Sequence, residues 1–304
     1  MSELQLIEVI HPQKDAGARY EALVGIDAHQ VLLLDELTLL LGAERTTRWL
    51  KRHHPSGLPV AGTLTAGSPL VLLSGEVGCG KTALAASVGT PLAKGLDRKV
   101  VGLETPSNIR GWGRVGEISA RITEAFEQAC ARARQVGCGL LIIDEADDLA
   151  TARGEMQAHH EDRAGVNVLI KQIDRIARER VPLAVLMITN RPDALDPAVM
   201  RRASLHLRFD RPNPAQRRAV IERLLAGTQH TETEIEELVK ATRPRRGVKF
   251  SFSDLTVRLA RAALRRAWRA DRPLSPAVLL ETLAEIEPSP PIGPPSNKEV
   301  CDDV

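Results

Sequence analysis

A glycine-rich loop at residues 75–82 limits most strongly what this chain can fold into. It matches the pattern G-x-x-x-x-G-K-[ST] in full, after the apolar run 70–73 and before a helical pattern from Ala83. Such glycines let the backbone curl so that its N–H groups point at phosphate oxygens, Lys81 adds charge near the β- and γ-phosphates, and the Thr82 hydroxyl is placed to ligate Mg²⁺. The loop therefore predicts a site for ATP and Mg²⁺. Its predicted contact residues are Gly75, Glu76, Val77, Gly78, Cys79, Gly80, Lys81, Thr82 and Ala83.

Short apolar runs alternate with helical patterns through the middle of the chain. The runs are residues 70–73, 100–103, 140–143 and 183–188, and the helical patterns cover about 83–93, 117–134 and 165–178. Continuous apolar runs of this length are typical of parallel strands covered on both faces. The alternation predicts a doubly wound α/β sheet with right-handed crossovers. A further buried helix is expected within residues 20–50, where leucines are dense.

The strand signal stops after residue 210, and only helices are expected beyond it. Helix starts are predicted near Asn213, Thr231, Ser253 and Ser275, each a residue type that caps helices. The Pro-rich end of the chain has little to bury. We predict a lead-in over residues 1–20, a large α/β ATPase domain over 21–212, a small all-helical domain over 213–287 and a disordered tail over 288–304.

Composition excludes several classes of protein. No apolar run approaches the about 18 residues that a membrane-spanning helix needs, and the first residues do not resemble a secretory signal. The net charge of +2 argues against a strongly basic nucleic-acid binder. The 4 cysteines are too scattered to suggest a disulfide framework or a zinc site. We expect a cytoplasmic protein with reduced thiols.

Two carboxylates follow the apolar run 140–143. Asp144 is well placed to hold Mg²⁺ through water, and Glu145 to polarise the water that attacks the γ-phosphate. A strand that simply ends in charged residues is the alternative, and the phosphate loop upstream favours the functional interpretation.

Polar residues also follow the last of the apolar runs. Asn190 at its end is suited to a hydrogen bond with the attacking water or the γ-phosphate, although an Asn after a strand is usually a turn residue. Arg201 and Arg202 come soon afterwards. An arginine pair is normally a solvated face, but in an assembly an Arg supplied by another copy stabilises the charge on a transferring phosphoryl group.

This ordered set of motifs resembles the AAA+ ATPases over residues 23–286, nearly the whole chain. The resemblance implies a P-loop ATPase domain followed by a helical lid, in a ring that is usually a hexamer with ATP at the subunit interfaces. It assigns Asn190 to the sensor-1 position and Arg202, with Arg201 beside it, to the arginine finger. It also places Gly25 and Ile26 in the segment that lines the adenine pocket.

Finer features are similar to the pachytene-checkpoint and thyroid-receptor-interactor clade. Trp112 stands, between glycines and arginines, where these ATPases carry the pore-loop aromatic that grips a threaded polypeptide. A buried Trp112 is the alternative, and burial is the interpretation given to Trp49 and Trp268. Members of the clade remodel HORMA-domain proteins, and bacterial relatives act on a HORMA–nucleotidyltransferase complex in anti-phage signalling. The resemblance therefore implies such a partner and an antiviral role.

The chain departs from this clade in two places. The lead-in is too short for a substrate-recruiting N-terminal domain. Where a sensor-2 arginine is expected, near residues 251–255, the chain has Ser and Asp, so that role is not transferred; Arg258, one turn on, is only a candidate.

Two other functions compete with protein remodelling. The basic stretch 243–272 is compatible with a DNA-acting motor or loader, although a solvated helix face with subunit contacts accounts for it better and nucleic acid is not the expected partner. A nucleotide switch without hydrolysis is disfavoured because Asp144 and Glu145 are both present.

Overall fold

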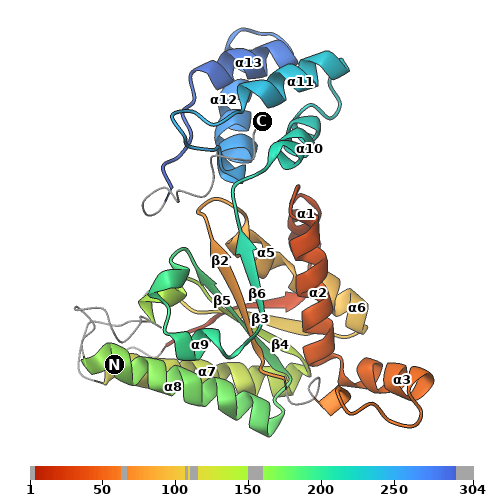
Figure 1. Cartoon of the computed structure of the whole chain (residues 1–304), viewed down its shortest axis with the longest axis vertical. Helices are drawn as coiled ribbons and strands as arrows, with labels where there is room; N and C mark the ends of the chain where they lie inside the picture. Colours follow the sequence, from red (N-terminus) through yellow and green to blue (C-terminus); the bar gives the residue numbers. More distant parts are fainter. Residues whose placement is uncertain (1–3, 63–66, 107–108, 110–115, 150–159, 292–304) are drawn as a thin grey trace. The chain divides into compact units, whose positions relative to one another are not determined.

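The computed structural model describes residues 4–62, 67–106, 109, 116–149 and 160–291 (Figure 1). The backbone forms two compact units. The first comprises residues 1–22, 28–74 and 81–208, and the second comprises residues 23–27, 75–80 and 209–304. The phosphate loop up to Gly80 thus groups with the C-terminal helices, and the residues that follow it group with the sheet.

A six-stranded sheet has the strand order β1-β3-β4-β5-β2-β6. The strands are β1 (Ile7–His11), β2 (Leu70–Gly75), β3 (Val100–Glu104), β4 (Gly139–Ile143), β5 (Leu183–Thr189) and β6 (Ala203–Phe209). β3, β4, β5 and β2 pair in parallel, and almost all of their residues are buried. The predicted doubly wound α/β sheet is confirmed, with an added antiparallel strand β1 beside β3.

Helices cover both faces of this sheet, as Figure 1 shows for α7 and α8 on one side and α2, α5 and α6 on the other. The helices of the first unit are α1 (Lys14–Glu21), α2 (Asp27–Leu41), α3 (Ala43–His53), α5 (Lys81–Ser87), α6 (Gly89–Leu96), α7 (Glu117–Val136), α8 (His160–Glu179) and α9 (Pro197–Met200), with 3₁₀ turns η1 (Ala146–Asp148) and η2 (Pro192–Ala194). Alternate strand residues such as Leu72, Leu141 and Val185 pack against α7 and α8 through Phe126 and Leu169. This alternation is what strands buried on both faces require.

Two single helices expected from the sequence are each divided. The leucine-rich stretch forms α2 and α3, which meet at Gly42, where an added Cβ would lie 2.4 Å from the Thr38 carbonyl oxygen. The helix after the phosphate loop is divided into α5 and α6, and Gly89 at the start of α6 touches the His11 ring. The approach at Gly42 is local to the end of α2, whereas the contact of Gly89 with His11 is a tertiary contact that periodicity does not reveal.

Two strands were not expected from the sequence. β1 has the sequence Ile-Glu-Val-Ile-His and β6 the sequence Ala-Ser-Leu-His-Leu-Arg-Phe, so neither contains a continuous apolar run. Both are edge strands with exposed residues. In β6 the alternation that leaves Leu207 and Phe209 buried and His206 exposed was the available signal.

The second unit is helical beyond β6. Its helices are α10 (Pro214–Leu224), α11 (Glu232–Ala241), the π-helix η3 (Asp254–Leu259), α12 (Ala260–Arg269) and α13 (Pro276–Ala284). Asn213 and Thr231 each close a capping box at the predicted helix starts, and Ser275 precedes α13. Its core contains the aromatic ring of Phe250 and aliphatic side chains such as Leu255.

The interpretation of Trp49 and Trp268 as buried is wrong. Trp268 is 81% exposed and Trp49 is 48% exposed. On α12 the buried positions are the small Ala263 and Ala267, so the large side chains of Leu264 and Trp268 are left on the outer face. Hydrophobicity alone does not decide which face of a helix is covered.

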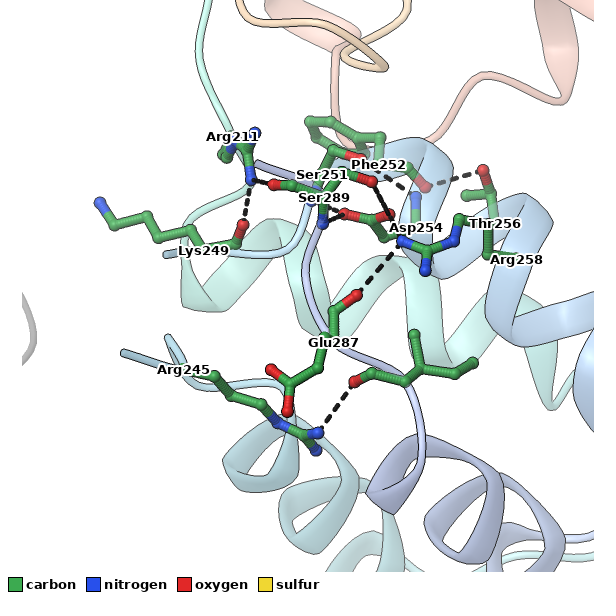
Figure 2. Close-up of polar contacts among 11 residues, drawn as sticks. Arg211, Arg245, Lys249, Ser251, Phe252, Asp254, Thr256, Arg258, Glu287 and Ser289 are labelled. Atoms are coloured by element: carbon green, nitrogen blue, oxygen red, sulfur yellow. Dashed lines mark hydrogen bonds and ion pairs between the residues drawn. The ribbon is translucent and has the colours of Figure 1, made fainter. Parts of the chain in front are cut away.

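Asp254 holds the end of the second unit together. Its fully buried carboxylate accepts hydrogen bonds from the Ser251 N–H at 2.9 Å and from the Ser289 N–H at 3.0 Å, and Arg258 pairs with it (Figure 2). Arg258 also donates to the Glu287 carbonyl at 3.2 Å. The chain after α13 is therefore fastened to η3, and Ser289, in the segment predicted to be disordered, is one of its anchors. The guanidinium of Arg258, the candidate for the sensor-2 role, is thus bound to Asp254 and to the Glu287 carbonyl.

Replacing Asp254 by asparagine is expected to destabilise the protein at pH 7 by about 2 kcal/mol, because the buried donors lose a charged acceptor. Burial raises the pKa of Asp254, but hydrogen bonds from Ser289 and Ser251 and from Arg258 outweigh it and lower the pKa from 3.8 to about 2. A lowered pKa in the folded state contributes stability that is present above pH 3.8 and is lost as the pH falls toward 2.

Urea unfolding of the parent and of Asp254→Asn at pH 7, 4 and 3 measures this effect. The difference in the free energy of unfolding should be nearly complete at pH 4 and clearly smaller at pH 3. The exposed Asp271 offers a control, since Asp271→Asn removes a carboxylate outside this network. A difference between parent and Asp254→Asn that is the same at all three pH values would contradict the assignment.

Candidate active site

The phosphate loop leaves the sheet at the carboxyl end of β2 and ends where α5 begins at Lys81. Gly75, Gly78 and Gly80 have φ angles of 120°, 72° and 93°, which other residues rarely adopt. A Cβ on Gly75 would lie 2.2 Å from the Phe209 carbonyl oxygen, which accepts the Glu76 N–H at 2.8 Å. The glycines are thus required both for the curl of the loop and for the close approach of the chain after β6.

Within the second unit, the phosphate loop contacts both the helices and residues 23–27. The Gly78 carbonyl accepts the Ser253 N–H at 2.8 Å, and a Cβ on Gly78 would lie 2.9 Å from that of Ser253. The Gly25 carbonyl accepts a hydrogen bond from Gln216 of α10 at 2.6 Å. Ile26 is buried and lies near Gly80. The segment predicted to line the adenine pocket therefore lies against the phosphate loop.

Asp144 and Glu145 follow β4, as the sequence predicts. The Thr82 hydroxyl donates to Asp144 Oδ2 at 2.8 Å, and the Glu145 N–H donates to Asp144 Oδ1 at 2.8 Å. The Glu145 side chain is exposed, and its backbone is left-handed with φ 52°. A backbone in this region is strained for a residue with a Cβ, and such strain clusters at functional sites.

Thr82 and Asp144 form a partial ligand set of the kind that suits Mg²⁺. Their side chains offer neighbouring hydroxyl and carboxylate oxygens, the ligands that this ion prefers. Among the residues that the structure describes, there is no group of three His, Cys, Asp or Glu side chains able to hold a metal. Mg²⁺ commonly completes such a partial set with water and substrate phosphates.

Asn190 follows β5 and is half-buried. The register pairs Thr189 with Ser74, so Asn190 lies at the edge of the sheet from which the phosphate loop leaves. The Thr189 hydroxyl donates to Asp147 at 2.7 Å and accepts the Arg191 N–H at 2.9 Å. The amide of Asn190 makes no hydrogen bond to any residue that the structure describes, which leaves it available to a ligand.

The two arginines after α9 differ in their surroundings. Arg202 forms a two-pronged ion pair with Asp174 of α8, at 2.8 and 3.0 Å, and donates to the Ala198 carbonyl at 2.9 Å. The hydrogen bond with Asp174 raises the pKa of Arg202 further. Arg201 is exposed and has no ion-pair partner in the described part of the chain. The structure thus separates a tied arginine from one that is free to reach outward. Trp112 lies outside the described residues.

The family model described as "ATPase family associated with various cellular activities (AAA)" matches residues 71–211. "CD-NTase-associated protein 6" of Escherichia coli strain MS 115-1 is 41% identical over 269 residues, which are 85% of this chain and 86% of that relative. The chain belongs to the AAA ATPase family. As an AAA ATPase it hydrolyses ATP, and the resemblance found in its sequence is confirmed.

Solved structures agree with this membership. A chain in the structure of the E. coli MS115-1 HORMA:CdnC:Trip13 complex matches this AAA ATPase with a TM-score of 0.88 and 39% identity, over 95% of this chain and 97% of that one. A Rhizobiales Trip13 matches with a TM-score of 0.75 and 36% identity, over 94% of this chain and 99% of that one. In addition, none of the described helices of this AAA ATPase is long and apolar enough to cross a membrane.

Three acidic residues of this AAA ATPase were not found from the sequence. Glu104 ends β3 next to β4, and burial, followed by the negative charge of Asp144, raises its pKa. Asp147 binds Thr189, and Asp174 binds Arg202. For Glu104 a signal was present, because a carboxylate ends the strand that neighbours β4; the other two pairs join residues far apart in the sequence.

Proposed function

We propose that this AAA ATPase uses ATP hydrolysis to remodel a HORMA-domain protein bound to a nucleotidyltransferase, in a bacterial anti-phage system. The observation that carries the proposal is the match, over nearly the full length of both chains, to a chain in the HORMA:CdnC:Trip13 complex. The relative named CD-NTase-associated protein 6, similar over 85% of this chain, supports the same assignment.

Each group of the candidate site has its own role in ATP hydrolysis. The N–H groups of the phosphate loop and Lys81 bind the phosphates, and Thr82 with Asp144 would hold Mg²⁺, which neutralises charge on the phosphates when bound. Glu145 accepts a proton from the attacking water, and Asn190 orients that water or the γ-phosphate. Gly25 and Ile26 contact the adenine. The exposure of Glu145 fits its role, and so does the Asn190 amide, which makes no hydrogen bond to a residue in the described part of the chain.

The site is completed by a second copy of the chain. We propose a ring, expected to be a hexamer, in which an arginine of the neighbouring copy stabilises the transferring phosphoryl group. Arg201 and Arg202 are the two candidates from the sequence. Arg201 is exposed and has no ion-pair partner in the described ranges, which suits it to this task, and the ion pair with Asp174 would hold Arg202 beside it.

Trp112 is proposed to contact the client polypeptide in the pore of the ring. Replacing it by alanine should abolish disassembly of a HORMA–nucleotidyltransferase complex and leave basal ATP hydrolysis within about twofold of the parent, because Trp112 is not among the residues proposed to bind the nucleotide. Disassembly is followed by size-exclusion chromatography with ATP, and hydrolysis by phosphate release. Trp268→Ala, which removes an exposed tryptophan from α12, is the matched control. Parental disassembly by Trp112→Ala would count against the proposal.

One observation favours the alternative of a DNA-acting motor. Arg261, Arg265 and Arg269 of α12 are exposed beside Trp268 and lack an acidic partner among the described residues. A motor of that kind should show hydrolysis that DNA stimulates and that falls steeply with salt. Hydrolysis that does not respond to DNA at low salt would exclude it.

The cytoplasmic location stays a prediction from the sequence.

A further inference from the structure

Arg211 lies between β6 and α10 and joins three separate segments of the second unit. Its side chain is only 7% exposed. The Nε donates to Glu76 of the phosphate loop at 3.1 Å. The Nη1 donates to the carbonyls of Lys249 and Ser289, at 2.5 and 2.7 Å (Figure 2). One guanidinium therefore connects the phosphate loop with the chain before η3 and with the chain after α13.

The phosphate-loop end of this connection is a partly buried ion pair. The Glu76 side chain is 28% exposed, and its backbone N–H is held by the Phe209 carbonyl. Two residues later, Gly78 is held by the Ser253 N–H. Because a pair shielded from water is screened less than a surface pair, its loss should be felt by the loop. Residues 76–78 are thus positioned by groups that come from residues 209–253.

The other end of the connection is fixed by the Asp254 network. Ser289 donates its N–H and its hydroxyl to Asp254, which also binds Ser251. The backbone carbonyl of Ser289 is the group that Arg211 contacts. A continuous series of polar contacts therefore runs from Ser289 through Arg211 to Glu76, all within one compact unit.

The hydrogen bonding of Arg211 is incomplete. Its buried Nη2 has no partner among the described residues, and a buried donor without a partner costs free energy. The connection to Glu76, Lys249 and Ser289 is therefore made by Nε and Nη1 of the guanidinium.

We propose that Arg211 and Glu76 are positioning residues for nucleotide binding, through which the lid and the Ser289 segment hold the phosphate loop in its binding shape. Neither residue needs to touch the phosphates. Glu76 belongs to the phosphate loop, so holding its side chain also restrains the loop backbone. Arg211 holds that side chain and binds the backbone before η3 and after α13, which are helices of the lid. Loosening the connection at either end should weaken nucleotide binding and leave the chemical step unchanged. The proposal concerns the ATPase site and holds whatever the client protein is.

Full-length variants test the two ends. Glu76→Gln should raise the KM for ATP and the Kd for a fluorescent ADP analogue by about five- to tenfold, with kcat within about twofold of the parent. Arg211→Lys should show an intermediate loss, because lysine keeps the charge near Glu76 but cannot bridge the carbonyls. Ser289→Ala keeps the carbonyl that Arg211 contacts but removes the hydroxyl that anchors Ser289 to Asp254, so it should raise the Kd by a smaller factor. Glu222→Gln, which breaks the surface pair with Arg218 in α10, should leave the Kd unchanged.

A double-mutant cycle separates positioning from stability. If the connection runs through Arg211, Ser289→Ala should add nothing to the Kd once Glu76 is already glutamine. Losses in Kd that multiply, or a parental Kd together with a lower Tm, would overturn the proposal, since either result means that the two ends act independently or only on folding. An unchanged Kd for Glu76→Gln alone would overturn it as well.

Discussion

Glutamine in place of Glu145 is expected to lower the turnover number for ATP by about 10²- to 10⁴-fold and to leave the affinity for ATP close to that of the parent. The substitution removes only the group that accepts a proton from the attacking water. Glutamine has the same length, and the left-handed backbone at Glu145 is no harder for it to adopt, so the fold should not change. Phosphate release at saturating ATP and equilibrium binding of ATP measure the two quantities separately.

A matched control and a second variant sharpen this experiment. Glu179→Gln removes an exposed carboxylate from α8, where Glu179 pairs with Arg134 and Arg175, and should hydrolyse ATP at the parental rate. Asp144→Asn should differ from Glu145→Gln, because it loosens the Thr82–Asp144 pair and raises the Mg²⁺ concentration needed for half-maximal activity. If Glu145→Gln turns over like the parent, Glu145 is not the proton acceptor. A Glu145→Gln ring stalled with ATP should also retain its client.

Alanine in place of Arg201 is expected to lower the turnover number by about 10³-fold, because the charge on the transferring phosphoryl group loses its counter-ion from the neighbouring copy. The exposed side chain has no ion-pair partner among the residues that the structure describes, so the Tm should stay the same. Arg202→Ala should lower the Tm as well as the turnover, because Asp174 and the Ala198 carbonyl lose their donor. Steady-state hydrolysis and thermal unfolding of both variants distinguish the two arginines.

Mixing variants shows whether the arginine acts between copies. Glu145→Gln and Arg201→Ala are each expected to be nearly inactive, but a mixture forms interfaces that pair an intact Glu145 with an intact Arg201. Turnover in the mixture should exceed that of either variant by about tenfold or more. Asp174→Ala is the control, because it releases Arg202 without removing an arginine. A mixture no more active than its components, or parental turnover after loss of both Arg201 and Arg202, would refute a site shared by two copies.

The candidate nucleotide site could be placed from the sequence because its parts are short and local. The residues at 75–82 need no tertiary contact to be recognised, since glycine spacing, Lys81 and Thr82 follow one another along the chain. Asp144 and Glu145 could be placed for a similar reason: they end an apolar run, and parallel strands present their carboxyl ends at one edge of a sheet. The helix starts at Asn213 and Thr231 were predictable because a cap is an interaction within four residues.

The amino-acid sequence by itself thus determined the α/β fold, the phosphate loop and the acidic pair, because periodicity and local backbone chemistry encode them. Only the tertiary structure decided that β1 and β6 complete the sheet, that Trp268 is exposed, that Asp174 ties Arg202, and that Arg211 connects Glu76 with Ser289. Glu76 and Arg211 are 135 residues apart. Partners at such separations are brought together by the packing of whole elements, and neither partner carries a local pattern that points to the other.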